Sequence, residues 1–277
     1  MKYLTLLRVN NYIKNVIILV PVFFSGTLFM DNNLYIMLLS FICFSFITST
    51  VYIINDIHDK ESDCNHFRKK NRPIASNQIS ITFGYLICII LLLISSLLLI
   101  LLKLPYISLI FIYSYLFINI LYTYILKNIP YLDIFIIILN FIIRILYGAS
   151  ILSIKISLLL YITIINLALY LIIGKRRGEI IKNGIKARKV LKYYNNKIFD
   201  RLMIISLLLT IISYFIWVIT KKFLLIITLP IVIFALIRYN KNVFRNSYDD
   251  PIEIITNDYL IFALFIFWII VVTLILY

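Results

Sequence analysis

The chain has 277 residues, of which 63% are hydrophobic and 14% are charged, and its formal net charge is +15. Soluble globular domains are about 45–50% apolar and about 25% charged, so the composition excludes an ordinary soluble domain and favours a membrane protein. The positive charge alone is compatible with nucleic acid or anionic lipid as a partner, and the distribution of the basic residues decides between them.

Long apolar runs separated by polar breaks predict nine membrane-spanning helices. The runs cover about residues 16–30, 34–54, 79–102, 105–125, 131–153, 157–174, 202–219, 222–240 and 258–277. These runs are long and lack the alternation of strands, and a helix satisfies its own backbone hydrogen bonds in hydrocarbon. We therefore expect an all-α polytopic membrane protein in which residues 1–277 form one membrane domain.

Basic residues are concentrated on one side of the predicted membrane domain. Of the 27 Lys and Arg residues, 22 lie in the N-terminal segment and the even-numbered connections, and four lie in the odd-numbered connections. Cytoplasmic segments carry an excess of Lys and Arg, so we expect the N-terminus in the cytoplasm and the C-terminus outside. The same split favours a topology signal and contact with anionic lipid over nucleic-acid binding.

Acidic residues are concentrated after the second predicted helix. Four of the twelve acidic residues fall within eight positions, from Asp56 to Asp63. If the helix continues through them, Asp56, Asp59 and Asp63 share one face, and Asn55 lies one turn before Asp59. Oxygen ligands of this kind suit Mg²⁺ shared with a phosphate. The alternative is a solvated acidic loop balanced by the basic residues that follow it.

The acidic cluster is part of a longer signature. Residues 55–63 read N-D-x-x-D-x-x-x-D, and residues 72–76 read R-P-I-x-S. Together they resemble the UbiA superfamily of intramembrane prenyltransferases, whose signature ends in a glycine where this chain has Asn77. The resemblance implies nine helices in a bundle around a central cavity. It also implies active-site loops on the cytoplasmic side, at about residues 55–78, 122–133 and 174–200.

A second signature indicates a branch of this superfamily. Members that prenylate aromatic or other acceptors usually carry a second aspartate-rich motif after the sixth span, where this chain reads Gly-Lys-Arg-Arg-Gly-Glu at residues 174–179. That stretch, and the opening residues 8–15 despite departures at 9, 11 and 12, look like the decaprenyl-phosphate phosphoribosyltransferase branch. This resemblance implies transfer of 5-phosphoribosyl from phosphoribosyl diphosphate to a polyprenyl phosphate, with release of diphosphate and Mg²⁺ as cofactor.

The resemblance and the spacing together give a set of candidate site residues. The expected metal ligands are Asn55, Asp56, Asp59 and Asp63. The expected catalytic residues are Asp56, Asp59, Asp63, Lys127 and Asp133. The expected substrate-binding residues are Lys14, Asn15, Arg68, Lys70, Arg72, Tyr122, Asn140, Arg144, Lys175 and Arg176. The lipid phosphate is itself the nucleophile in this reaction, so no catalytic serine, cysteine or histidine is required.

The fifth predicted helix supports part of this set by its spacing. Asp133, Asn140 and Arg144 fall on one face of a helix. An arginine near the middle of a membrane helix costs about 2.5–3.5 kcal/mol on insertion scales, so Arg144 should face a polar cavity and have a partner.

Two other functions remain open from the sequence. The first is transfer of a prenyl group from prenyl diphosphate to an aromatic or other acceptor, which would need a second acidic motif. The second is a transporter or channel without enzymatic activity, whose intramembrane charges should be spread along a path through the bilayer.

Overall fold

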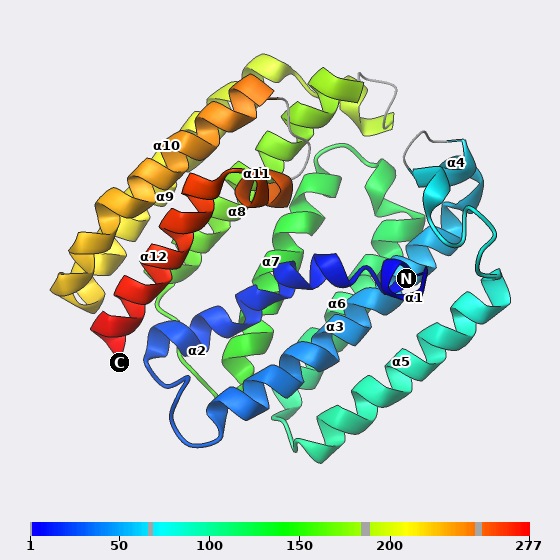
Figure 1. The fold of residues 1–277 in the computed structure, drawn as a ribbon, viewed down its shortest axis with the longest axis horizontal. Helices are drawn as coiled ribbons and strands as arrows, with labels where there is room; N and C mark the ends of the chain where they lie inside the picture. The colour runs from blue at the N-terminus through cyan, green and yellow to red at the C-terminus, as the bar shows by residue number, and fades with distance from the viewer. Residues whose placement is uncertain (1, 66–68, 184–188, 247–250) are drawn as a thin grey trace. The chain divides into compact units, whose positions relative to one another are not determined.

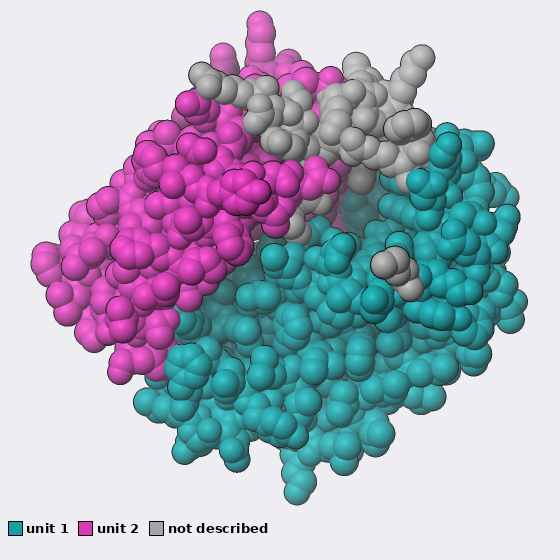
Figure 2. Space-filling view, in the orientation of Figure 1, with its two compact units in different colours: residues 1–127, 139–155 teal, residues 128–138, 156–277 magenta. Residues whose placement is uncertain are grey.

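The computed structural model describes residues 2–65, 69–183, 189–246 and 251–277, and helices are the only regular elements in these ranges (Figure 1). The chain forms two compact units (Figure 2). Unit 1 comprises residues 1–127 and 139–155, and unit 2 comprises residues 128–138 and 156–277.

Eight helices in the described residues are long and apolar enough to cross a membrane. They are α3 (Asn33–His58), α5 (Ile81–Leu101), α6 (Tyr106–Tyr124), α7 (Leu132–Ile151), α8 (Leu158–Asn183), α9 (Asn196–Lys221), α10 (Thr228–Asn246) and α12 (Tyr259–Leu276). The shorter elements are α1 (Lys2–Leu7), η1 (Val9–Leu19), α2 (Val20–Ser25), α4 (Lys60–Cys64), η2 (Lys69–Asn71), η3 (Leu126–Asn128), η5 (Lys189–Tyr193), η6 (Phe223–Ile227) and α11 (Pro251–Asn257). These helices confirm the predicted all-α membrane fold.

The first predicted span differs from the structure in its position and length. It was expected at residues 16–30, whereas the shorter apolar helix formed by η1 and α2 covers Val9–Ser25. Gly26 ends this helix in the left-handed conformation, with φ 82°. Arg8, which is also left-handed with φ 52°, separates it from α1. Backbone breaks at both ends therefore move the helix toward the N-terminus.

The sixth span is longer in the structure than the sequence predicts. It was expected to end at residue 174, but α8 continues to Asn183, so Lys175 and Arg176 lie in a helix rather than in a loop. No proline interrupts this stretch, and Arg176 pairs with Glu179 three residues later. Such i,i+3 pairs support a helix, so the glycines at 174 and 178 do not end it.

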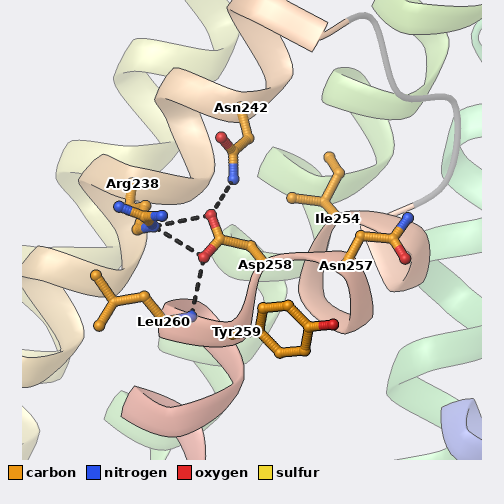
Figure 3. A pocket seen from close by; sticks show the side chains of 7 residues that line it. All are labelled: Arg238, Asn242, Ile254, Asn257, Asp258, Tyr259 and Leu260. Atoms are coloured by element: carbon orange, nitrogen blue, oxygen red, sulfur yellow. Dashed lines mark hydrogen bonds and ion pairs between the residues drawn. The ribbon is translucent and has the colours of Figure 1, made fainter.

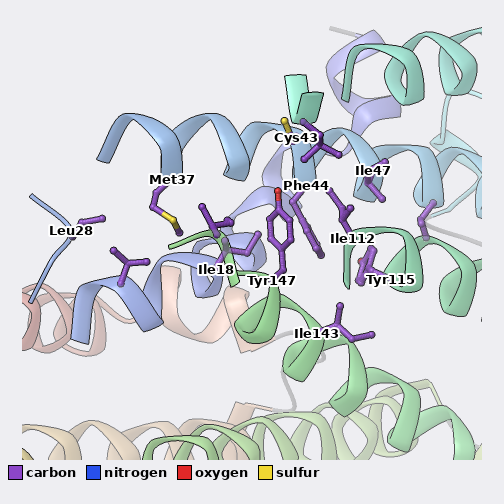
Figure 4. Packing of buried hydrophobic residues seen from close by; sticks show 14 residues of the cluster. Ile18, Leu28, Met37, Cys43, Phe44, Ile47, Ile112, Tyr115, Ile143 and Tyr147 are labelled. Atoms are coloured by element: carbon purple, nitrogen blue, oxygen red, sulfur yellow. The ribbon is translucent and has the colours of Figure 1, made fainter. Parts of the chain in front are cut away.

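Helix α3 is the centre of unit 1 and packs against α5, α6 and η1. Figure 4 shows the apolar cluster around it, which includes Ile18, Phe44, Ile112 and Tyr147, all fully buried. Small polar residues of α3, such as Ser45 and Ser49, occur between the apolar ones, and such residues let membrane helices approach closely. The acidic cluster follows directly at the C-terminal end of this well-packed helix.

Gly148 allows a close backbone contact in unit 1. A Cβ atom at this position would lie 1.9 Å from the carbonyl oxygen of Ile18 and 2.8 Å from its carbonyl carbon. Helix α7 and η1 therefore meet backbone to backbone, and no side chain fits between them. This contact fixes η1, which carries Asn15, against α7, which carries Arg144.

In unit 2, α8 and α9 pack along each other, and α10 packs against α12. Asp258 joins the second pair, as Figure 3 shows. It accepts hydrogen bonds from Arg238 Nε at 2.8 and 2.9 Å and from Asn242 Nδ2 at 2.6 Å, and it caps the first backbone N–H groups of α12. Partial burial opposes ionisation of Asp258, but these hydrogen bonds outweigh it and lower the pKa of the carboxyl group.

The Gly148 contact predicts a strong effect of the smallest substitution. Gly148→Ala should destabilise the protein by about 1–3 kcal/mol, because the added methyl group meets a backbone carbonyl that cannot move aside. The midpoint of thermal unfolding of the purified protein in detergent measures this. The matched control is Gly174→Ala in α8, where the added Cβ would lie 3.4 Å from the flexible Met203 side chain. An equal effect of both changes would contradict this interpretation of the contact.

Candidate active site

The acidic cluster lies where α3 continues into α4. The backbone N–H of Asp59 donates to the carbonyl of Asn55 at 2.9 Å, and that of Asp63 donates to the carbonyl of Asp59 at 2.8 Å. Helical hydrogen bonding therefore continues past the end of α3, and Asp56, Asp59 and Asp63 follow on successive turns. Glu61, which is not part of this spacing, is exposed to solvent.

Two of the three carboxylates are buried and share one cation. Asp56 and Asp63 are each 2% exposed. Arg72 Nη1 donates to Asp56 Oδ1 at 3.1 Å and to Asp63 Oδ2 at 2.5 Å. Arg8 also donates to Asp56 Oδ1. The two carboxylates thus converge on one nitrogen of a positively charged guanidinium group, which offsets their mutual repulsion.

The third carboxylate has a different cation. Asp59 is more accessible, with a side chain 23% exposed, and it accepts a hydrogen bond from Lys127 Nζ at 2.5 Å. Lys127 lies in η3, directly after α6. The structure therefore brings the predicted catalytic residues Asp56, Asp59, Asp63 and Lys127 together at one end of unit 1.

The segment that carries Arg72 is held by the rest of its motif. Ile74 is fully buried and packs with Leu6 and Ile53 under the site. Asn77 has φ 57°, so the position where the resembling signature has glycine is in the left-handed conformation. Asparagine tolerates this conformation better than most residues, which explains how the departure preserves the turn.

The other basic residues of this segment are Lys69, which was not among the candidates, and the candidates Lys70 and Arg68. Lys69 Nζ lies 3.9 Å from Asp63 Oδ1. Lys70 is exposed, and Arg68 lies outside the described residues.

Arg144 belongs to a second cluster of buried polar side chains in unit 1. Its Nε donates to Asn15 Oδ1 at 3.0 Å, its Nη1 to the Asn140 carbonyl at 2.9 Å, and its Nη2 to the Tyr115 hydroxyl at 2.9 Å. Asn140 also exchanges two hydrogen bonds with Asn119. The expected partners of Arg144 are present, and all of them are neutral. No described carboxylate lies within ion-pair distance of this guanidinium.

Asp133 belongs to a different group from the one its spacing predicted. It lies in unit 2, where Arg176 Nη2 is 3.0 Å from its Oδ2 and Arg176 Nη1 is 2.7 Å from Glu179 Oε2. Arg176 is 1% exposed, so this is a buried cation between two carboxylates. The Tyr194 hydroxyl also donates to Asp133 Oδ1 and accepts from the backbone N–H of Tyr131. Burial and the bond to Asp133 raise the pKa of Tyr194, so this phenol remains a protonated donor.

Among the charged and aromatic contributors to these groups, the candidate set missed Arg8, Tyr115, Glu179 and Tyr194. Arg8 had a signal, because it belongs to the opening motif of the resembling branch. Tyr115 is one turn before Asn119 on α6, but no spacing distinguishes it from the many other tyrosines. The remaining candidates Lys14, Tyr122 and Lys175 are half-buried residues of η1, α6 and α8, respectively.

The acidic end of unit 1 has the donors that a hard divalent cation prefers. Asp56 and Asp63 present oxygens to one positive atom, and Asn55 and Asp59 lie in the adjacent turns. Within the described ranges, no three His, Cys, Asp or Glu side chains are gathered closely enough to hold a metal by themselves. A cation here would therefore also need Asn55, water or phosphate oxygens.

Comparison with protein families matches residues 18–266 to a model described as the UbiA prenyltransferase family. Two relatives named decaprenyl-phosphate phosphoribosyltransferase are each 25% identical to this chain. The one from Corynebacterium glutamicum aligns with 76% of this chain and 65% of its own length, and the one from Mycobacterium tuberculosis with 83% and 78%. The uncharacterized protein y4nM of Sinorhizobium fredii is 37% identical over 90 residues, which is 32% of this chain and 17% of that protein. This chain thus spans less than two thirds of two of these relatives.

Comparison with solved structures identifies the fold. A UbiA homologue from Archaeoglobus fulgidus, solved with DMAPP and Mg²⁺ bound, superposes with a TM-score of 0.74 and covers 99% of this chain and 100% of its own. The two sequences are 20% identical.

The role of Arg72 as the cation shared by Asp56 and Asp63 can be tested without an activity assay. Arg72→Met should lower the free energy of unfolding by about 3–5 kcal/mol, and the midpoint of thermal unfolding with it, because it leaves two buried carboxylates without their common cation. Millimolar Mg²⁺ should restore part of this loss, since an ion bound only by the folded state stabilises it. Lys70→Met, which removes an exposed cation, is the matched control. An equal response of both variants to Mg²⁺ would contradict a shared cation position.

Proposed function

The chain belongs to the UbiA prenyltransferase family, and we propose that within it the chain is a Mg²⁺-dependent polyprenyl-phosphate phosphoribosyltransferase. The bond between the anomeric carbon of phosphoribosyl diphosphate and its diphosphate oxygen breaks, and the electron pair leaves with diphosphate. A phosphate oxygen of the lipid forms the new bond to that carbon. The observation that carries the proposal is the pair Asp56 and Asp63, which converge on one positive charge beside Lys127. The names of the two phosphoribosyltransferase relatives support this donor and acceptor.

The acidic end of unit 1 fits the proposed cofactor. Asn55, Asp56, Asp59 and Asp63 would hold Mg²⁺, since carboxylate and amide oxygens are ligands that this ion accepts. When bound, the ion neutralises charge on the diphosphate leaving group. The Archaeoglobus fulgidus UbiA homologue solved with DMAPP and Mg²⁺ supports a role for this ion in the fold.

Basic residues around the acidic cluster hold the phosphates in this proposal. Arg72 and Lys127 neutralise the carboxylates by short hydrogen bonds. With Mg²⁺ held by these carboxylates, the two cations would turn to phosphate oxygens instead. Lys70 and Arg68 add positive charge in the same segment of the chain. Positioning and electrostatic stabilisation supply the rate, because the monoester phosphate of the lipid, with a second pKa near 6, is largely ionised at neutral pH. No general base is required.

The buried polar group of unit 1 supports a site for an anion. Arg144 has only neutral partners among the described residues, so its charge is solvated by amides and a phenol rather than neutralised by a carboxylate. A buried cation of this kind is costly in a membrane protein, and such residues usually serve function. We assign Arg144, Asn15 and Asn140 to substrate binding, with Lys14 and Tyr122 in the neighbouring elements.

Unit 2 contributes Lys175 and Arg176 to the proposal. Arg176 is neutralised by Asp133 and Glu179, so its role is to order the end of α8. Lys175, the preceding residue on α8, is assigned to the acceptor phosphate. The excess of basic residues in the N-terminal segment and the even-numbered connections supports a site and an N-terminus in the cytoplasm and a C-terminus outside.

A second candidate function is prenyl transfer from a prenyl diphosphate. The buried pair Asp133 and Glu179 favours it, because these carboxylates form a second acidic group despite the basic sequence around them. The Archaeoglobus fulgidus homologue has also been solved with GPP and Mg²⁺.

A direct assay distinguishes the two reactions. Purified protein in nanodiscs is incubated with polyprenyl phosphate, Mg²⁺ and phosphoribosyl diphosphate labelled in the ribose, and lipid-soluble label is measured. We expect label in the lipid fraction, lost on chelation of Mg²⁺. The matched reaction contains labelled prenyl diphosphate and an aromatic acceptor. Product only in the matched reaction would reject phosphoribosyl transfer in favour of prenyl transfer.

Substitutions separate the assigned roles. Asp59→Asn should reduce kcat by about 10²–10³-fold, as does loss of one group that stabilises charge in a transition state. Lys175→Ala should chiefly raise KM for polyprenyl phosphate. Glu61→Gln, an exposed change in the same acidic cluster, is the control and should leave both constants unchanged. Similar kinetics for Asp59→Asn and Glu61→Gln would contradict the assignment of Asp59.

A further inference from the structure

Unit 2 contains an apolar groove that the proposed reaction does not use. The groove has a volume of about 230 Å³ and lies among α7, α8 and α9. Its most buried lining residues are Ile134, Ile173 and Phe199. Phe135 and Ile198 line it as well, and they are 56% and 51% exposed. The groove therefore has an apolar floor and accessible apolar edges.

The position of the groove indicates the kind of molecule that covers it. All three helices are long and apolar enough to cross a membrane, so the exposed edges face hydrocarbon. One end of the groove is lined by Tyr131, Tyr194 and Asn195, which precede α7 and α9. The two tyrosine rings contact edge to face with centroids 5.4 Å apart. Tyrosines are typical of the level of lipid headgroups, so the groove runs from the headgroup level into the hydrocarbon.

Positive charge lies beside this polar end. Lys197 and Arg201 are one turn apart on α9 and are both exposed. Each is adjacent in the helix to an apolar lining residue, Ile198 or Leu202. The neighbouring carboxylate, Asp200, is engaged by Arg177 at 2.5 Å.

The other acidic group near the groove is also neutralised. Asp133 is paired with Arg176 and accepts from Tyr194. Lys197 and Arg201 pair with none of the described carboxylates, so the exposed charge here is positive. Basic pockets between membrane helices on the cytoplasmic side bind anionic lipid headgroups.

We propose that this groove is a binding site for an anionic phospholipid. One acyl chain lies along Phe135 and Ile198, and the phosphate lies at Lys197 and Arg201. The phospholipid is neither substrate nor product of the proposed reaction, so the site stands or falls independently of that reaction.

Quenching of an introduced tryptophan by brominated acyl chains tests this site. Phe135→Trp places a probe in the groove, and Ile198→Trp is a second probe in case the first does not fold. The natural Trp217 and Trp268 give a background that is measured on the unsubstituted protein and subtracted. We expect half-maximal quenching at about a thirtyfold lower mole fraction of brominated phosphatidylglycerol than of brominated phosphatidylcholine, the ratio that two cations near an anionic headgroup provide. Phe265→Trp, an exposed position on α12, should show no preference.

Charge variants in the probe background complete the test. Lys197→Gln/Arg201→Gln should abolish the preference for phosphatidylglycerol. Lys155→Gln/Lys221→Gln removes the same charge at two other exposed positions and should retain it. The proposal is overturned if the groove probe shows no preference or if the preference survives in Lys197→Gln/Arg201→Gln. It is also overturned if unlabelled polyprenyl phosphate, but not unlabelled phosphatidylglycerol, relieves the quenching at equal mole fraction, since the groove would then bind the acceptor.

Discussion

Two carboxylates buried side by side at the end of a membrane helix need a shared positive charge. Asp56 and Asp63 meet this requirement through Arg72, whose Nη1 contacts both, and through Arg8. Removing ions from water costs several kcal/mol each, so such a pair persists only when its cations are placed accurately. Much of unit 1 serves that placement. The segment after α4 returns Arg72 to the carboxylates by burying Ile74, and Arg8, directly before η1, reaches Asp56 from the N-terminal segment.

The placement of η1 depends on contacts well away from the carboxylates. Asn15 donates to Ser45 and Thr48 of α3 and accepts from Arg144 of α7. Gly148 lets the backbone of α7 meet that of η1. Arg144 on α7 thus joins α7 to η1 through Asn15 and to α6 through Tyr115. It also places a positive charge in a polar interior. The geometry of the acidic end and the buried polar group are therefore properties of one packed unit.

The sequence predicted much of the fold because hydropathy dictates membrane helices, and the helical repeat of about 3.6 residues per turn determines which aspartates share a face. It did not predict that Asp133 would pair with Arg176 and Glu179, since one-dimensional spacing on α7 says nothing about the residues that α8 presents. Tyr194 had no signal, because its partner Asp133 is 61 residues away. The first helix was displaced because left-handed Arg8 and Gly26 set its ends, and hydropathy does not report backbone conformation. The opening motif marks Arg8 as a candidate, but the sequence does not predict that it contacts Asp56.

In this account a divalent cation replaces Arg72 between Asp56 and Asp63 when substrate binds. Locating the metal tests this most directly. A structure of the protein with Mn²⁺ and phosphoribosyl diphosphate, with the ion identified by its anomalous scattering, would show where it binds. The result expected is Mn²⁺ bonded to both carboxylates, with Arg72 displaced toward phosphate oxygens. Arg72 still bridging Asp56 and Asp63, with Mn²⁺ bound elsewhere, would contradict the central role given to this pair.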